Sequence, residues 1–163
     1  MMWALSHRFD PRAAGLADRH YSRQKPGTPQ FMPSGRAFVL YAEDDGHRAV
    51  WGTSWPEHAR HEWEGAWLCS IFRNEGFPRS HKLIRQAVAA TLWRYGEAPS
   101  LGMITFVKED AVRPKRDPGF TFIMAGFRPI GRTRRHGHLV LQLLPKRMPK
   151  PVAPRGAQME LVL

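Results

Sequence analysis

The residues best suited to carry chemistry stand together at the end of one apolar stretch. Residues 66–72 (AWLCSIF) predict a buried strand, which is followed at once by Arg73, Asn74 and Glu75. Side chains at the end of such a strand emerge into a crevice, where α/β proteins bind ligands. Arg73 is suited to bind an anionic cofactor, Asn74 to orient a carbonyl, and Glu75 to deprotonate an amine if burial raises its pKa. The alternative is a polar turn that only caps the next helix.

The segment after this turn predicts a helix and a second buried strand. Residues 80–96 carry apolar side chains at helical spacing, with Ser80 suited to cap the first turn and Gly96 to end the helix. Residues 102–107 (GMITFV) predict the strand. A strand, a polar turn that opens a helix and a second strand can present backbone N–H groups to an anion. Ser80 therefore joins Arg73 and Asn74 as a cofactor-binding candidate.

Two other segments supply candidate catalytic groups. Tyr21 ends a helix predicted from residue 11, and is either a general acid or only a helix-terminating residue. Ser22 is its candidate hydrogen-bonding partner. Asp117 is the only carboxylate in the basic loop 112–118, and either pairs with the cations beside it or faces the site as a second carboxylate. The eight histidines and the single cysteine show no spacing typical of a metal site.

The positive charge of the chain is concentrated in its second half. Residues 111–163 contain eleven Lys and Arg against two acidic residues, which gives nine of the eleven net positive charges. This one-sided distribution indicates a polyanionic partner, duplex DNA first, although a solvated basic face is the alternative. The side chains expected at the nucleic acid are His20, Arg23, Lys25, Arg113, Lys115, Arg116, Arg132, Arg134 and Arg135.

The remaining segments complete a mixed order of elements. Four tryptophans near the central strands, Trp51, Trp55, Trp63 and Trp67, suit either core packing or stacking on a base drawn out of a duplex. Asp45-Gly46 is a strong hairpin signal between two strands. The other predicted elements are strands over 37–41 and 49–55, a short helix over 119–125, and a closing hairpin of 128–133 with 138–144.

This order of elements resembles the acetyltransferase fold of the GNAT superfamily over roughly residues 5–144. The most specific local match is Ala125-Gly126-Phe127, where GNAT proteins commonly carry an AGF-like or LGF-like turn before a strand. The resemblance implies a single α/β domain over residues 1–144, with a central mixed and mostly antiparallel sheet flanked by helices. It also maps residues 70–83 onto the segment that binds the pyrophosphate of coenzyme A. Residues 73–80 (RNEGFPRS) replace the family's Arg/Gln-x-x-Gly-x-Gly/Ala loop, so the donor is left open: acetyl-CoA or another acyl donor.

A narrower similarity is to the Mom-type DNA-modification proteins of bacteriophages, a divergent GNAT-like group. It rests on His20-Tyr21-Ser22, the polar turn 73–75 and the basic second half. The resemblance implies a transferase that adds a carbamoylmethyl group to N6 of adenine in DNA and so blocks restriction. Two alternatives remain: an acetyl-CoA-dependent N-acetyltransferase of a small molecule or protein, and a non-catalytic nucleic-acid-binding module.

Composition bounds the class of protein. A chain of 163 residues with 42% hydrophobic residues fits one globular domain. No apolar run approaches the ~20 residues of a membrane span, and the N-terminus lacks the pattern of a secretory signal. The single cysteine, Cys69, fits a reducing compartment, so we expect a cytoplasmic protein of a bacterial host. Residues 145–163 are basic and contain four prolines, which predicts a flexible tail.

Overall fold

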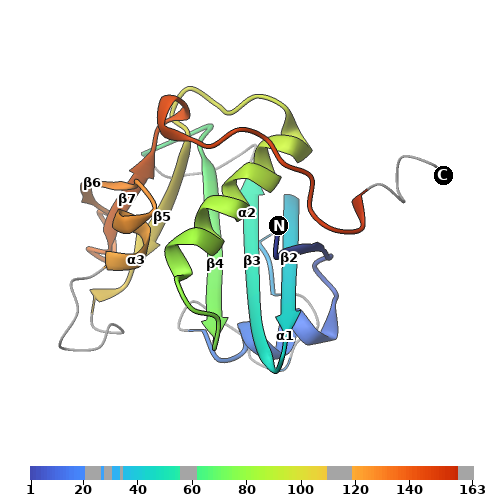
Figure 1. Cartoon of the computed structure of the whole chain (residues 1–163). Helices are drawn as coiled ribbons and strands as arrows, with labels where there is room; N and C mark the ends of the chain where they lie inside the picture. The colour runs from blue at the N-terminus through green and yellow to red at the C-terminus, as the bar shows by residue number, and fades with distance from the viewer. Residues whose placement is uncertain (21–26, 28–30, 34, 56–61, 110–118, 158–163) are drawn as a thin grey trace.

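The computed structural model describes residues 1–20, 27, 31–33, 35–55, 62–109 and 119–157. In this part of the chain, one α/β domain is built on a seven-stranded, mixed and mostly antiparallel sheet in the order β1-β2-β3-β4-β5-β7-β6 (Figure 1). The strands are β1 (Ala4–Leu5), β2 (Arg36–Asp44), β3 (His47–Trp55), β4 (Trp67–Glu75), β5 (Met103–Val107), β6 (Arg128–Arg132) and β7 (Leu139–Leu143). The α-helices of the described residues are α1 (Pro11–Ala17), α2 (Ser80–Tyr95) and α3 (Phe120–Met124).

The three longest strands, β2, β3 and β4, are neighbours in the sheet and form its central part. β2 and β3 pair antiparallel over their full lengths, and the turn between them places Asp45 and Gly46 at φ 48° and 80°. This confirms the hairpin expected from Asp-Gly, because both positions of such a turn need positive φ. Both strands are longer than the sequence predicts, since their ends are polar and carry no apolar alternation.

Helices cover both faces of this centre. Along β2, Phe38 and Leu40 face the core under α2, whereas Val39 and Tyr41 face the core under α1, as the two-residue period of a strand requires. From α2, Leu83, Ile84, Ala87 and Val88 pack into the first of these cores. The sheet is therefore buried on both sides where β2, β3 and β4 meet the helices.

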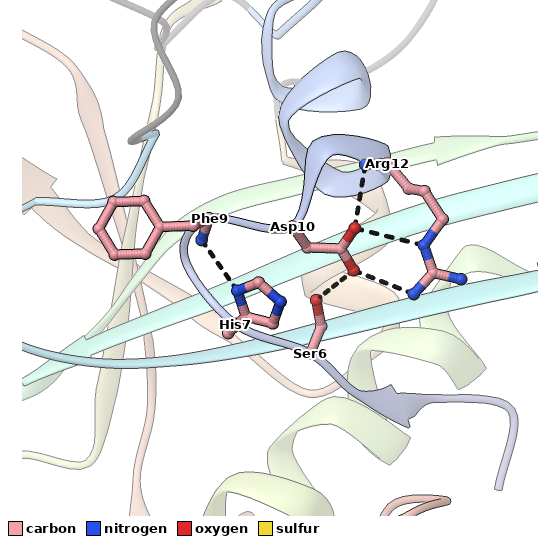
Figure 2. Close-up of polar contacts among 5 residues, drawn as sticks. All are labelled: Ser6, His7, Phe9, Asp10 and Arg12. Atoms are coloured by element: carbon pink, nitrogen blue, oxygen red, sulfur yellow. Dashed lines mark hydrogen bonds and ion pairs between the residues drawn. The ribbon is translucent and has the colours of Figure 1, made fainter.

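The carboxylate of Asp10 fixes the start of α1. It accepts hydrogen bonds from the backbone N–H of Arg12 at 3.0 Å, from Nη2 of Arg12 at 3.0 Å and from Oγ of Ser6 at 2.8 Å (Figure 2). Nearby, Nδ1 of His7 accepts from the N–H of Phe9 at 3.2 Å. The helix begins at Pro11 as predicted, with Asp10 as its N-cap, but it ends at Ala17, and Tyr21 lies outside the described residues.

The C-terminal segment differs from the expected flexible tail. A short 3₁₀ turn, η2 (Pro145–Arg147), is followed by extended chain that runs beside the N-terminus. The N–H of Arg155 donates to the carbonyl of Trp3 at 2.9 Å, and the N–H of Leu5 donates to the carbonyl of Arg155 at 2.8 Å. Ala157 is fully buried. Prolines break regular structure here, yet the backbone still finds hydrogen-bond partners at β1, so residues 145–157 belong to the folded domain.

Among the described helices, none has both the length and the apolar character needed to cross a membrane.

Candidate functional site

β4 and β5 begin as neighbours and then diverge. They are parallel, and their pairing extends only from Trp67–Met103 to Cys69–Thr105. β4 continues to Glu75 paired with β3 on its other side, and in Figure 1 the two strands separate towards their carboxyl ends. Within the described residues, that edge of β4 has no strand partner beyond Cys69. The carboxyl end of a parallel pair is where α/β sheets bind ligands.

A β-bulge marks the point of divergence. Gly52 of β3 pairs with Ile71 and Thr53 pairs with Cys69, so Ser70 is the additional residue. Its hydroxyl donates to the carbonyl of Gly52 at 3.3 Å. Bulges bend a strand and increase its twist, and they are frequent beside active sites. The bulge thus turns the second half of β4, with its polar end, away from β5.

Glu75 at the end of β4 is held by two arginines. Nε and Nη2 of Arg19 donate to its two carboxylate oxygens at 2.8 and 2.9 Å, and Nε of Arg73 donates to one of them at 2.6 Å. Nη1 of Arg73 also donates to the carbonyl of Arg19 at 2.9 Å. The carboxylate therefore orients two guanidinium groups at the carboxyl end of the strand.

Glu75 was a candidate general base on the condition that burial raises its pKa, and this condition is not met. The hydrogen bonds from Arg19, followed by those from Arg73, lower this pKa to about 2 against the cost of partial burial. At neutral pH the carboxylate is ionised and a weak proton acceptor. Proximity of two cations decides the outcome, because an opposite charge within hydrogen-bond distance favours the charged form. Glu75 is better suited to position Arg19 and Arg73 than to act as a general base.

Asn74 closes the turn between β4 and α2. Its Oδ1 accepts from the N–H of Phe77 at 2.9 Å, and its Nδ2 donates to the carbonyl of Phe77 and to Oγ of Ser80, both at 2.7 Å. The side-chain amide is thus engaged within the turn, as in the capping alternative. Arg79 occupies the N-cap position of α2, in the left-handed conformation at φ 56°, but its side chain makes no capping hydrogen bond. Ser80 is the first helical residue. The prediction of Ser80 as N-cap is wrong by one position, because its hydroxyl bonds Asn74 instead of a helical N–H.

His20 lies beside Arg73 and is partly buried. Burial, followed by the positive charge of Arg73, lowers the pKa of His20 to about 4. The imidazole is therefore neutral at pH 7, and it cannot offer the positive charge expected of a phosphate contact. Sequence analysis could not show the contribution of Arg73, since Arg73 is far from His20 in the chain.

Of the arginines and lysines expected to contact nucleic acid, those that the structure describes lie at the β6–β7 hairpin. Nη1 of Arg132 pairs with Oε1 of Glu109 at 2.5 Å, and Nε of Arg134 pairs with Oε1 of Glu62 at 2.6 Å. Arg135 is exposed in the same turn. The other candidates lie outside the described residues: Tyr21, Ser22, Arg23, Lys25, Arg113, Lys115, Arg116 and Asp117.

The tryptophans divide between core and periphery. Trp51 and Trp67 are fully buried, which excludes them from stacking on a base in this conformation. Trp55 is partly buried and packs edge-on against Trp67, with ring centroids 5.9 Å apart. Trp63 contacts Phe106 on the other face of the sheet, at 6.3 Å between centroids.

Arg19, Glu62 and Glu109 are the residues of this region that sequence analysis missed. Their partners lie on other elements, so no local pattern marks them. Among the described residues, no group of three or more His, Cys, Asp or Glu side chains could hold a metal ion. No protein-family model, curated protein or solved structure matches the chain. Function is therefore inferred from the residues and their geometry.

Proposed function

We propose that this protein is a GNAT-like transferase that moves a small acyl-like group from a donor to an amine of a DNA base. The modification would be of the Mom type, on adenine, and would protect phage DNA from restriction. The observation that carries the proposal is the divergence of parallel β4 and β5 beyond Cys69, at the Ser70 bulge. The order of helices and strands, on which the GNAT resemblance rests, supports it as well.

The divergent edge of β4 suits an extended donor. Beyond Cys69, its backbone N–H and C=O groups pair with no strand on that side in the described part of the chain, and such groups need partners when they are shielded from water. At the far end of the strand, Glu75 orients Arg73 and Arg19, whose guanidinium groups suit an anionic part of the donor. The donor would thus lie along β4 with its charged part towards the two arginines.

The transfer requires one proton acceptor. The amine nitrogen bonds to the transferred carbon, the bond between that carbon and the leaving group breaks with its electron pair, and the amine loses a proton. Glu75 is a poor acceptor because of its low pKa. The proposal therefore assigns the proton to the carboxylate of Asp117, or to Tyr21 if its hydroxyl is first deprotonated, and it keeps Glu75 as a positioning residue.

DNA is the proposed substrate because the protein is strongly positively charged and DNA is a polyanion. The net charge of +11 favours a polyanion, and the paired arginines of the β6–β7 hairpin are exposed on the surface of the fold. An acceptor bound through its phosphates would be retained next to the sheet while one base enters the site.

Mass spectrometry of nucleosides tests this function directly. DNA from cells that express the chain should contain a modified deoxynucleoside that is absent from cells with an empty vector. Arg73→Ala should reduce its amount at least tenfold. Arg94→Ala, at the opposite end of α2, is the matched control and should leave it unchanged. Unmodified DNA from cells with abundant folded protein would reject the proposal.

A second measurement separates the alternatives. Thermal unfolding of the purified protein is followed with acetyl-CoA, with duplex DNA and with both. Stabilisation by acetyl-CoA together with acetylation of a small amine or a protein, and unmodified DNA, would favour an ordinary N-acetyltransferase. Stabilisation by DNA alone with no modified nucleoside would favour a binding module without catalysis.

A further inference from the structure

The tip of the β6–β7 hairpin is a self-contained turn. The N–H of Thr133 donates to the carbonyl of His138 at 2.9 Å, and the N–H of His138 donates back to Oγ1 of Thr133 at 2.9 Å. The N–H of Gly137 donates to the carbonyl of Thr133 at 3.0 Å, with Gly137 at φ 65°. His136 stacks on His138, with ring centroids 5.4 Å apart. The turn therefore presents its side chains from a fixed backbone.

This tip lies at the same end of the sheet as the candidate site. Leu139, the first residue of β7, pairs with both Val107 at the end of β5 and Arg132 at the end of β6. β4 runs parallel to β5, so its last residue, Glu75, points towards that end too. Figure 1 shows β6 and β7 at the edge of the sheet opposite β1. A ligand held at the tip would reach the sheet beside the ends of β4 and β5.

The edge strand does not suit pairing with another strand. All of β6 is exposed, but Pro129 lacks an N–H, and a bulge at Ile130 breaks the register between Pro129–Leu141 and Gly131–Val140. Arg128 and Arg132 at its ends would repel the same face of a second copy. The occupant of this edge therefore contacts side chains and carries negative charge.

Two glutamates from other segments pair with two of the three arginines of the tip. Glu62, which precedes β4, pairs with Arg134, and Glu109, which follows β5, pairs with Arg132. The side chain of Arg134 is 88% exposed, so its carboxylate partner is readily exchanged. A phosphate offers the same arginines more acceptor oxygens than a carboxylate does.

We propose that the tip of the β6–β7 hairpin, residues 132–138, docks on duplex DNA, and that phosphates displace Glu109 from Arg132 and Glu62 from Arg134. A two-stranded ribbon fits the major groove of a duplex, with the flanking arginines on the backbone. The proposal rests on the proposed function for its choice of DNA, and it names the surface that binds this substrate. Contacts to phosphates give affinity that depends on salt and little on sequence.

Fluorescence anisotropy with a labelled duplex of mixed sequence tests this, at several salt concentrations. Arg132→Ala with Arg134→Ala should weaken binding, and should reduce the slope of log affinity against log salt by roughly two, about 0.9 for each phosphate contact. Glu62→Gln with Glu109→Gln should tighten binding about two- to tenfold, because the phosphates no longer compete with carboxylates. A melting curve for each variant checks that it is folded.

The matched control is Glu43→Gln with Glu97→Gln. It changes the net charge by the same amount, on β2 and after α2, away from the hairpin. Equal tightening by both glutamate pairs would show that only net charge matters, and would overturn the docking surface. Unchanged binding by the arginine variant would overturn it as well, as would binding to anionic phosphatidylserine vesicles without binding to the duplex.

Binding and modification are read separately. If the hairpin variants behave as expected but no modified nucleoside is found, the docking surface stands and the transferase proposal fails. If DNA is modified and the hairpin variants bind it as the unaltered chain does, the transferase proposal stands and this surface fails.

Discussion

Arg19 and Glu75 form a two-point ion pair across 56 residues of sequence, with Nε and Nη2 of the arginine 2.8 and 2.9 Å from the two carboxylate oxygens. The pair joins the turn after α1 to the last residue of β4, and Arg73 adds a third contact from the same strand. The carboxylate consequently fixes the positions of two cations at the carboxyl end of the sheet's central strand.

Glu75→Gln should destabilise the protein at neutral pH and have a smaller effect in acid. The folded pKa of Glu75, about 2, lies below its ordinary value of 4.5, so its stabilisation is present above about pH 4.5 and lost as the pH falls towards 2. We expect a loss of about 1–2 kcal/mol at pH 7, with solvent screening of the half-exposed Arg19 taken into account. Urea unfolding at pH 7 and near pH 3 measures it, with Glu43→Gln as an exposed control. Equal losses at both pH values would contradict this role.

His20 should remain neutral down to about pH 4 in the folded protein. Its folded pKa lies below the 6.5 of the unfolded chain, so the unfolded state takes up the proton first and stability falls as the pH drops from 6.5 towards 4. NMR titration of the imidazole carbons gives the pKa directly. Arg73→Gln should raise it, because a repelling cation is removed, whereas Arg94→Gln should not. An ordinary titration near 6.5 in the unaltered protein would show that His20 is solvated.

The hydroxyl of Thr53 should stabilise the protein, because it accepts the hydrogen bond of a buried tryptophan N–H. Nε1 of Trp51 donates to Oγ1 of Thr53 at 2.7 Å, the two threonine oxygens are 3.1 Å apart, and Oγ1 of Thr91 donates to the carbonyl of Ala87 at 2.8 Å. Thr53→Val leaves the buried indole N–H without an acceptor and should cost about 1–3 kcal/mol. Urea unfolding measures this, and Thr53→Ser should restore most of it. If Thr53→Ser is as damaging as Thr53→Val, methyl packing and not the hydroxyl is responsible.

Truncation after Leu144 should lower the melting temperature by about 6–12 °C. Three of the backbone hydrogen bonds that it removes join the segment to distant parts of the fold: two between Arg155 and residues 3 and 5, and one from Val152 to Ala89 of α2. At about 1 kcal/mol for each bond, the loss is about 3 kcal/mol, and a chain of this size loses about 2–4 °C for each kcal/mol. A chain that ends at Ala157 keeps all three bonds and serves as control. Equal melting temperatures for the two truncated chains would restore the flexible-tail hypothesis.

The sequence alone located most of the segments that become strands and helices, although not β1. Apolar alternation, the Asp45-Gly46 turn and the apolar face of residues 80–96 located β2, β3, β4, α2 and β5 to within a few residues. Such signals are local, since a helix or a hairpin needs only neighbouring residues to form its hydrogen bonds. The errors in the predicted bounds lie at the polar ends of these elements. At Ser80, for example, the hydroxyl bonds the side chain of Asn74 and not a backbone N–H of the helix.

Only the tertiary structure decided what the polar residues do. The charge state of Glu75 depends on Arg19, that of His20 on burial beside Arg73, and the order of residues 145–157 on the free edge of β1. Each of these partners is remote in sequence and is brought near by the strand order of the sheet. Burial and Coulomb interactions act through space, so their effect on a side chain is set when the sheet and its helices have assembled.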